Sequence, residues 1–276
     1  MIVTESLIAI ALQAAFRAGK AIMDIYSGPF EVELKTDNSP LTIADKTAHS
    51  LIAEGLSDTE IPILSEEGTQ ISYEFRKSWK QFWLVDPLDG TKEFIKKNGD
   101  FTVNIALIRD QEPVLGVVFA PVSGFMYWGS QSGSYRLDTM KLDATGFENY
   151  QLTKTISERL PCISRTQGYL VLGSRSHMNV ETESFIRELQ NTHPDLLFIA
   201  RGSSLKFCIL AEGGADIYPR FGPTMEWDIA AGHAVAIFAG CSVQQAENGL
   251  PLRYNKPSLL NPNFIAQRKK NEVTNF

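Results

Sequence analysis

Residues able to do chemistry gather in one short stretch of the chain, Trp83–Thr91, which reads WLVDPLDGT. The pattern predicts an apolar strand that runs into a turn carrying two carboxylates, Asp86 and Asp89, and the hydroxyl of Thr91. Mg²⁺ takes oxygen ligands, favours carboxylates and shares its remaining positions with water and phosphate. Two such ions about 4 Å apart can clamp the attacking and leaving oxygens of a phosphoryl displacement. The stretch therefore predicts metal-assisted phosphoryl chemistry, such as that of a phosphatase.

Further acids stand on both sides of this stretch. Glu66 and Glu67 precede it, and Asp228 follows it in the segment Met225–Asp228. Each acid alone has an ordinary explanation, because Asp, Pro and Gly are usual turn residues, glutamates occupy solvated loops and acids favour helix starts. An apolar strand that ends in two acids around Pro-Leu must nevertheless place both carboxylates where their charges are accommodated. We predict four carboxylate metal ligands and one backbone carbonyl: Glu66, Asp86, Asp89, Asp228 and the carbonyl of Leu88.

Gly90 and Thr91 precede a predicted short helix, Lys92–Lys97. Unpaired N–H groups at a helix start attract anions, and a glycine lets a phosphate approach the backbone. The Thr91 hydroxyl could orient a water molecule, cap the helix, or do both. Asp45 is its candidate partner, since a carboxylate that accepts the Thr91 proton would complete a general-base relay. The residues alone favour a simpler role for Asp45, as the acid of a capping box that starts at Thr42.

The bulk composition excludes several classes of protein. The chain has 276 residues, 43% of them apolar, and a net charge of −6. An acidic chain argues against a surface that coats nucleic acid. Its three cysteines are far apart and form no Cys-x-x-Cys pair, which favours neither a disulfide framework nor a zinc site and points to a reducing cytosol. Polar residues interrupt the apolar N-terminal run, so we expect neither a signal peptide nor a spanning helix there.

The pattern of predicted secondary structure changes part-way along the chain. Apolar periodicity predicts helices over 5–26 and from Thr42 onward, packed against an antiparallel-rich sheet. After about Thr155 strands and helices alternate, as in a layered α/β unit. We therefore predict two halves, 1–155 and 156–276, with Asp228 crossing the junction to join the other acids. The strands expected in the first half are 31–35, 61–64, 82–85, 101–108, 114–120, 125–129 and 134–137. In the second half we expect strands at 169–172, 197–200 and 215–218, and helices at 180–190, 203–211 and 228–238.

Three motifs together resemble the signatures of the inositol monophosphatase superfamily, in the right order and at plausible separations. They are Ser65–Glu67 (SEE), Asp86–Thr91 (DPLDGT) and Glu226–Gly232 (EWDIAAG). The resemblance spans nearly the whole chain and implies a layered αβαβα sandwich of the α+β class. Within the superfamily, the chain more closely resembles the bacterial 3'(2'),5'-bisphosphate nucleotidases. The segments that carry this closer likeness are Lys92–Phe94, Gly173–His177, Gly202–Phe207 and Tyr218–Thr224.

The resemblance also implies a role for each motif residue. Two or three Mg²⁺ ions would be held by Glu66, Asp86, Leu88, Asp89 and Asp228. Asp45 and Thr91 would activate water together with Glu66, which reverses the preference for a capping role of Asp45. The scissile phosphate would contact Glu66, Leu88, Asp89, Gly90, Thr91 and Asp228.

Substrate choice depends on a second set of polar residues. Around the second phosphate and the nucleoside we place His177, Ser203, Lys206 and Arg220. Lysine and arginine suit a phosphate that no metal neutralises. Structural alternatives exist for three of these residues: Ser203 as a helix N-cap, Lys206 directed to solvent and His177 as a structural residue.

The reaction implied is Mg²⁺-dependent hydrolysis of adenosine 3',5'-bisphosphate to AMP and phosphate, which clears a by-product of sulfate activation in sulfur assimilation. Inhibition by Li⁺ is implied with it. One alternative is a phosphatase for inositol or sugar monophosphates, and a remote one is a non-catalytic phosphoester or metal sensor. The expected partner is a small nucleotide, with neither a nucleic-acid polymer nor a transmembrane segment. We expect a cytoplasmic protein; attachment to the inner membrane, and the choice between monomer and homodimer, stay open.

Overall fold

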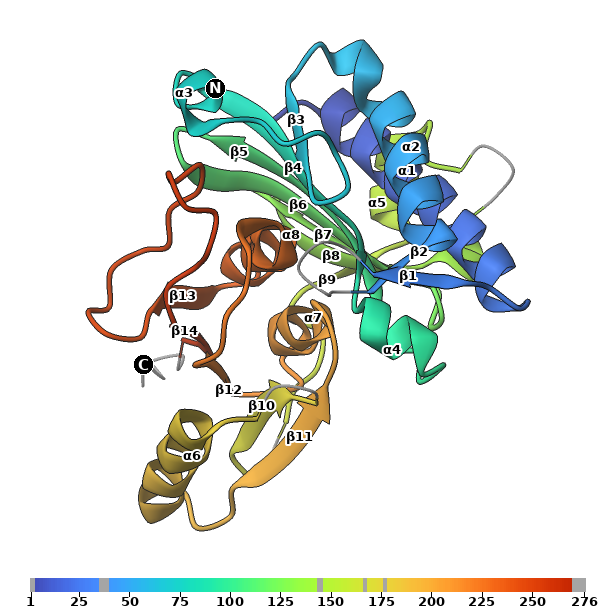
Figure 1. Ribbon diagram of the computed structural model, residues 1–276. Helices are drawn as coiled ribbons and strands as arrows, with labels where there is room; N and C mark the ends of the chain where they lie inside the picture. The colour runs from blue at the N-terminus through green and yellow to red at the C-terminus, as the bar shows by residue number, and fades with distance from the viewer. Residues whose placement is uncertain (1–2, 35–39, 143–145, 166–167, 176–177, 270–276) are drawn as a thin grey trace.

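Five layers make up the fold: helices, a sheet, helices, a second sheet and a helix (Figure 1). The computed structural model describes residues 3–34, 40–142, 146–165, 168–175 and 178–269. Helices α1 and α2 cover one face of the large sheet, α7 and α8 lie between the two sheets, and α6 lies outside the smaller sheet. The α+β layered sandwich that the sequence resemblance implies is confirmed.

The large sheet has seven strands in the order β3-β4-β5-β6-β7-β8-β9. Strands β3 and β4 are parallel and every later neighbour is antiparallel. The strands span Ile63–Ser65 (β3), Gln81–Asp89 (β4), Thr102–Arg109 (β5), Glu112–Ala120 (β6), Phe125–Ser130 (β7), Gly133–Asp138 (β8) and Glu158–Arg159 (β9).

Strand β4 extends further than the sequence predicts. It pairs with β5 up to Asp86↔Asn104, and the register then shifts before Asp89↔Thr102. Both aspartates therefore lie within the strand, and the prediction of a turn that starts at Asp86 is wrong. The irregularity spans Pro87, which has no N–H to donate to a neighbouring strand.

Helices α1 (Glu5–Tyr26) and α2 (Ile43–Leu56) pack against each other and on the large sheet. The apolar stripe of α1 is buried there, and its buried members include Ile8, Leu12, Ala15 and Ile22. By length and composition alone α1 could cross a membrane, and it is the one helix in the described ranges with that property. In this structure the helix instead supplies one side of the core.

Helix α8 (Glu226–Phe238) approaches the opposite face of the large sheet closely. A Cβ atom at Gly116 of β6 would lie 2.2 Å from the carbonyl oxygen of Ala231, and one at Gly129 of β7 would lie 2.8 Å from that of Ala234. Only glycine permits this contact, because any side chain at either position would overlap the helix backbone. The close fit fixes α8 on the sheet and so places its first turn, with Asp228, near the end of β4.

The smaller sheet has five strands in the order β11-β10-β12-β14-β13. Its strands are β10 (Leu170–Ser174), β11 (Leu197–Arg201), β12 (Ile217–Arg220), β13 (Cys241–Gln245) and β14 (Phe264–Arg268), and the helices around it are α6 (Val180–Thr192) and α7 (Leu205–Glu212). The sequence does not predict β13 and β14, whose short spans mix apolar and polar residues. The remaining short elements are β1 (Val32–Leu34), β2 (Pro40–Thr42), α3 (Tyr73–Arg76), α4 (Thr91–Ile95), α5 (Tyr150–Thr155) and two single-turn 3₁₀ helices, Ser57–Thr59 and Thr139–Lys141.

The three cysteines are free, as the sequence predicts: Cys162 is exposed, and Cys208 and Cys241 are buried. The division of the chain at residue 155 stays a prediction. Helix α8 belongs to the second half in sequence but packs on the large sheet of the first.

His233, in the middle of α8, makes the stability of the fold depend on pH. Its Nδ1 lies 2.7 Å from the Tyr254 hydroxyl, and burial lowers the pKa of His233 to about 3. An unfolded histidine binds a proton below its ordinary pKa of about 6.5, and the folded one does not. The stability that neutral His233 contributes is therefore present above pH 6.5 and lost as the pH falls towards 3.

We expect the wild-type free energy of unfolding, measured in EDTA, to fall between pH 7 and pH 5 by about 2 kcal/mol more than that of His233→Gln. Denaturant titrations of both proteins at the two pH values test this. Equal losses in the two proteins would contradict the assignment of a neutral, buried His233.

Candidate metal and phosphate site

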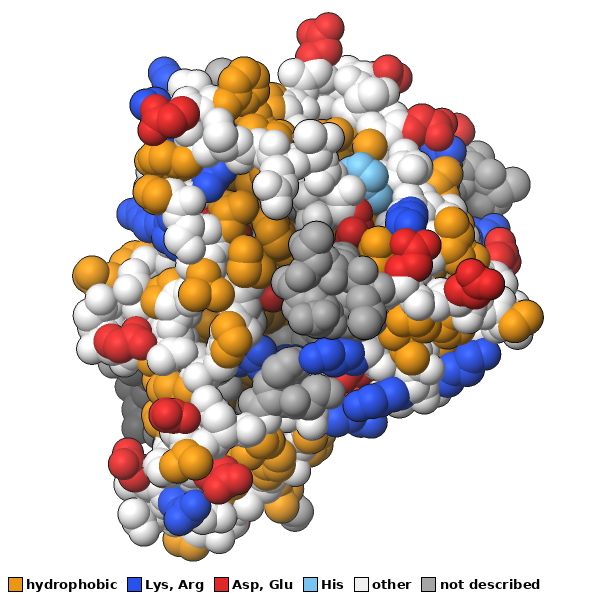
Figure 2. All heavy atoms as spheres, in the orientation of Figure 1, with side chains coloured by type: hydrophobic (Ala, Val, Ile, Leu, Met, Phe, Trp, Pro, Cys, Tyr) orange, Lys and Arg blue, Asp and Glu red, His pale blue; other side chains and the backbone are white. Residues whose placement is uncertain are grey.

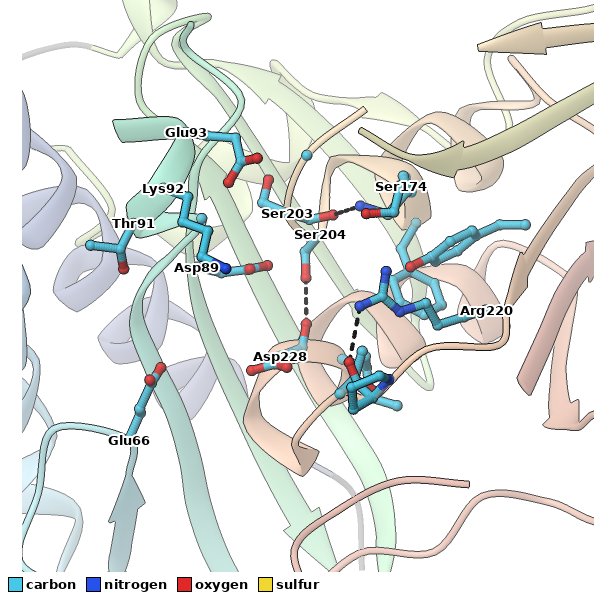
Figure 3. A pocket seen from close by; sticks show the side chains of 18 residues that line it. Glu66, Asp89, Thr91, Lys92, Glu93, Ser174, Ser203, Ser204, Arg220 and Asp228 are labelled. Atoms are coloured by element: carbon cyan, nitrogen blue, oxygen red, sulfur yellow. Dashed lines mark hydrogen bonds between the residues drawn. The ribbon is translucent and has the colours of Figure 1, made fainter. Parts of the chain in front are cut away.

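Four acidic side chains from three elements converge at one end of the large sheet, and Figure 3 shows three of them, Glu66, Asp89 and Asp228. Glu66 follows β3, Asp86 and Asp89 lie on β4, and Asp228 is the third residue of α8. Carboxylate oxygens of Glu66, Asp86 and Asp228 lie within 4.8 Å of one another. Asp89 lines a cavity of about 240 Å³ together with Glu66 and Asp228. The structure thus brings together the four carboxylates that the sequence predicts as metal ligands.

Burial and mutual repulsion make these carboxylates hard to ionise together. Burial raises the pKa of Asp86 well above its ordinary value, and the negative charges of Glu66 and Asp89 raise it further. Burial and the charge of Asp89 likewise raise the pKa of Asp228. Burial also raises the pKa of Asp89, although the nearby Lys206 ammonium opposes this shift. A bound cation would offset the repulsion and restore the ionised forms.

The chemistry of the donor atoms fits Mg²⁺. Glu66, Asp86 and Asp228 offer only carboxylate oxygens, the ligands that hard divalent cations prefer. The Oδ1 atom of Asp86 accepts a hydrogen bond from the Leu88 N–H at 3.1 Å, which fixes the orientation of that carboxylate. The Leu88 carbonyl accepts from the Thr91 hydroxyl at 3.3 Å. Its role as a metal ligand stays a prediction.

Asp45 makes both contacts that the sequence left as alternatives. Its Oδ2 accepts from the N–H and the hydroxyl of Thr42, at 2.7 and 2.6 Å, and so caps α2. Its Oδ1 accepts from the Thr91 hydroxyl at 3.1 Å. Burial raises the pKa of Asp45, while the hydrogen bonds from Thr42 and Thr91 oppose that rise. One carboxylate therefore fixes the start of α2 and orients Thr91 beside the acids.

The other side of the cavity carries cations and hydroxyls. Lys206 is nearly fully buried, and its ammonium donates to the carbonyls of Arg201 and Ser203 at 3.2 and 2.6 Å. Burial lowers the pKa of Lys206 to about 8, although the charge of Asp89 opposes this shift. The alternative in which Lys206 points to solvent is wrong, because α7 lies between the two sheets and its lysine faces inward.

Ser203 and Arg220 line the same cavity. Ser203 adopts a left-handed backbone with φ of 44°, and its buried Oγ has no hydrogen-bond partner among the described residues. The N-cap of α7 is Ser204, so the alternative role of Ser203 as a helix cap is wrong. Arg220 donates from Nε and Nη2 to the carbonyls of Gly222 and Pro223, at 3.2 and 2.9 Å. His177 lies outside the described residues.

Exposed lysines gather around α4, whose first turn lines the cavity. Lys92, Lys96 and Lys97 lie on and directly after α4, and Lys92 is one of the residues that line the cavity. On the face drawn in Figure 2, Lys and Arg side chains gather over this part of the molecule. An acidic protein therefore presents positive charge beside its acidic site, which favours the approach of an anionic ligand.

Comparison with known proteins shows the family of this chain. The model of the inositol monophosphatase family matches residues 3–275. This chain belongs to the inositol monophosphatase family. It is 46% identical over 257 residues to the 3'(2'),5'-bisphosphate nucleotidase CysQ of Escherichia coli strain K12, with 91% of this chain and 96% of that protein covered. The corresponding protein of Haemophilus influenzae is 34% identical, with 95% and 92% covered.

Solved structures of relatives share the fold. The crystal structure of CysQ from Bacteroides thetaiotaomicron, a bacterial member of the family, is 46% identical and has a TM-score of 0.87, with 96% of this chain and 98% of that chain covered. The extragenic suppressor protein suhB from Bartonella henselae is 24% identical, with a TM-score of 0.73 and coverage of 96% and 94%. The family that the motifs indicated is confirmed.

Sequence reasoning missed several residues at this inositol monophosphatase-family site. Asn104 and Ser204 contact the acids or their backbone, and Ser174 and Tyr218 line the cavity. The sequence held one usable signal, because Asn104 is the one polar residue within the stretch 103–108 of β5. The others are ordinary residues whose proximity to the acids only the packing of the layers produces.

Substitution of Asp86 tests the charge repulsion. Asp86→Asn removes one negative charge and keeps an oxygen that can accept from the Leu88 N–H. Because the folded pKa of Asp86 is raised, the wild-type protein loses stability as the pH rises through that pKa. In EDTA at pH 8 we expect the variant to melt at a higher temperature than the wild type, by roughly 2–4 °C per kcal/mol of repulsion removed.

Calorimetry with and without excess Mg²⁺ measures both effects. Mg²⁺ should raise the melting temperature of the wild type more than that of Asp86→Asn. The exposed Asp195 provides the control, since Asp195→Asn should change neither value. A wild type that melts above Asp86→Asn in EDTA would contradict the argument.

Proposed function

We propose that this protein is a Mg²⁺-dependent phosphatase that hydrolyses adenosine 3',5'-bisphosphate to AMP and phosphate. The observation that carries the proposal is the convergence of the four carboxylates beside the Asp45–Thr91 pair, opposite a buried lysine and arginine. Relatives at 46% identity that are named 3'(2'),5'-bisphosphate nucleotidases support the choice of substrate.

The carboxylates of Glu66, Asp86, Asp89 and Asp228 and the Leu88 carbonyl would hold the ions. Bound Mg²⁺ supplies the positive charge that offsets these carboxylates and the phosphate. Gly90 and Thr91 line the cavity, and we assign their backbone N–H groups to the scissile phosphate. The left-handed φ of 98° at Gly90 directs the chain from β4 into α4 at this point.

Asp45 and Thr91 would activate the water. The single proton of the Thr91 hydroxyl has two acceptors in reach, Asp45 at 3.1 Å and the Leu88 carbonyl at 3.3 Å. When it is donated to Asp45, the Thr91 oxygen keeps its lone pairs to accept a hydrogen bond from water. Asp45 then acts as the general base through Thr91. Glu66 borders the same space and completes the trio that the sequence predicts. The hydrogen bond between Asp45 and Thr91 favours a catalyst over a non-catalytic sensor.

Lys206 and Arg220 would stabilise the second phosphate, with Ser203 and His177. Burial strengthens a charge-assisted hydrogen bond, and both cations are nearly fully buried. The Lys206 ammonium also lies 5.3 Å from the centre of the Tyr218 ring. Inhibition by Li⁺, occupancy by two or three ions, a role in sulfur assimilation and a cytoplasmic location stay predictions of the same proposal.

The assay that tests the substrate measures phosphate release from adenosine 3',5'-bisphosphate and inositol 1-phosphate, side by side with Mg²⁺. One hydrogen bond to a charged group is worth about 1.5–3 kcal/mol, so we expect kcat/KM to favour the bisphosphate by at least roughly tenfold. Arg220→Gln should reduce this preference, whereas Arg187→Gln, on an exposed face of α6, should leave it unchanged. A preference for the inositol ester would favour the alternative substrate.

Removal of the Thr91 hydroxyl tests the activation of water. Thr91→Val keeps the volume of the side chain, and we expect kcat to fall roughly 10²- to 10⁴-fold. Thr91→Ser should recover most of the activity. Thr139→Val is the matched control, because the Thr139 hydroxyl donates to the Gly124 carbonyl away from the cavity. Full activity in a folded Thr91→Val protein would rule out the relay.

A further inference from the structure

Asn104 is a completely buried amide in the middle of β5. It stands opposite Asp86 in the pairing of β4 with β5, and its neighbours Val103 and Ile105 are apolar and fully buried. A buried amide is costly unless its hydrogen-bonding groups are satisfied. The partners of Asn104 therefore explain its presence in this strand.

Those partners fix the orientation of the amide. The Thr102 hydroxyl donates to Oδ1 of Asn104 at 3.2 Å, so the NH₂ group faces the other way. That group donates to Oδ2 of Asp89 at 3.1 Å and to Oγ of Ser204 at 3.0 Å. Both donor hydrogens are used, one on β4 and the other at the start of α7.

Ser204 continues the contact to α8. Its Oγ donates to the backbone carbonyl of Asp228 at 2.8 Å, which Figure 3 shows as a dashed line. Ser204 stands at the N-cap of α7 but makes no capping bond with its side chain, so its hydroxyl is free to donate to α8. A continuous chain of hydrogen bonds thus runs from the Asp89 carboxylate through Asn104 and Ser204 to Asp228.

We propose that Asn104 and Ser204 are positioning residues that hold Asp89 and Asp228 at a fixed separation before a metal ion binds. The inference rests on the proposed function, in which both acids are Mg²⁺ ligands. These acids belong to different layers, and their charges repel each other. Without the bridge the two acids would move apart in the metal-free protein, and the ion would have to draw them together at a cost to its affinity.

The test measures the Kd of Mg²⁺ by titration calorimetry on the full, metal-free chain without substrate. We expect Asn104→Ala to weaken binding roughly 10- to 100-fold. Ser204→Ala leaves the contact between Asn104 and Asp89 in place, and we expect it to weaken Mg²⁺ binding roughly tenfold. The double variant should lose less than the product of the two effects, because both residues act in one chain of hydrogen bonds.

Ser134 provides a matched control. It is as buried as Ser204, and its Oγ also donates at 2.8 Å to a carbonyl of α8, that of Val235, farther along the helix. If Ser204 only anchored α8, then Ser204→Ala and Ser134→Ala would lower the melting temperature alike and leave the Kd of Mg²⁺ unchanged. We expect both to lower the melting temperature and only Ser204→Ala to raise the Kd.

Wild-type affinity in a folded Asn104→Ala protein, or equal loss of affinity in the two serine variants, would overturn the inference. If Asn104→Ala does not fold, Thr102→Val replaces it. This change removes the hydroxyl that donates to the amide at 3.2 Å, together with its longer contact to Oδ2 of Asp89 at 3.5 Å, and should also raise the Kd. Asp89→Asn distinguishes a failure of the proposed function from a failure of the positioning role of Asn104 and Ser204. Wild-type Mg²⁺ affinity in Asp89→Asn would refute the proposed function, whereas weak binding by Asp89→Asn with wild-type affinity in Asn104→Ala would refute only the bridge.

Discussion

Repulsion among buried carboxylates is the constraint on which the rest of this structure depends. Glu66, Asp86, Asp89 and Asp228 share a desolvated space, and each negative charge raises the cost of ionising its neighbours. Left to themselves, such groups would separate or bind protons. The surrounding fold therefore has to hold the four carboxylates close together against their mutual repulsion, and a bound cation would offset that repulsion.

The scaffold resists the repulsion by close packing and by directed hydrogen bonds. Glycines at 116 and 129 let α8 lie directly on the large sheet, so its first turn cannot withdraw from β4. The Asp228 carboxylate accepts from the Met225 N–H at 2.8 Å, which orients it at the helix start. Asn104 of β5 bonds to the Asp89 carboxylate, and Ser204 at the N-cap of α7 bonds to the backbone of Asp228. These bonds connect the large sheet to the helices beside it where the acids meet.

Asp45 shows how structural and chemical roles coincide in one side chain. A carboxylate has two oxygens, and here each has a separate partner: Thr42 at the start of α2 and Thr91 beside the acids. The capping bonds hold the group in place, and that rigidity keeps the second oxygen directed at Thr91. The capping role and the proposed catalytic role do not compete, because fixing the orientation of the carboxylate serves both.

The sequence alone was enough to identify the family and the layered fold and to name the acids that meet beside Thr91, because the Asp-Pro-Leu-Asp-Gly-Thr motif and its companions occur in a fixed order. Their role as metal ligands stays a prediction. The sequence did not show that Asp86 and Asp89 lie within β4, since register depends on pairing with β5. Nor did it show that Lys206 is buried or that Asn104 and Ser204 join Asp89 to α8. Those facts depend on contacts between layers, which the local sequence around Lys206, Asn104 and Ser204 does not specify.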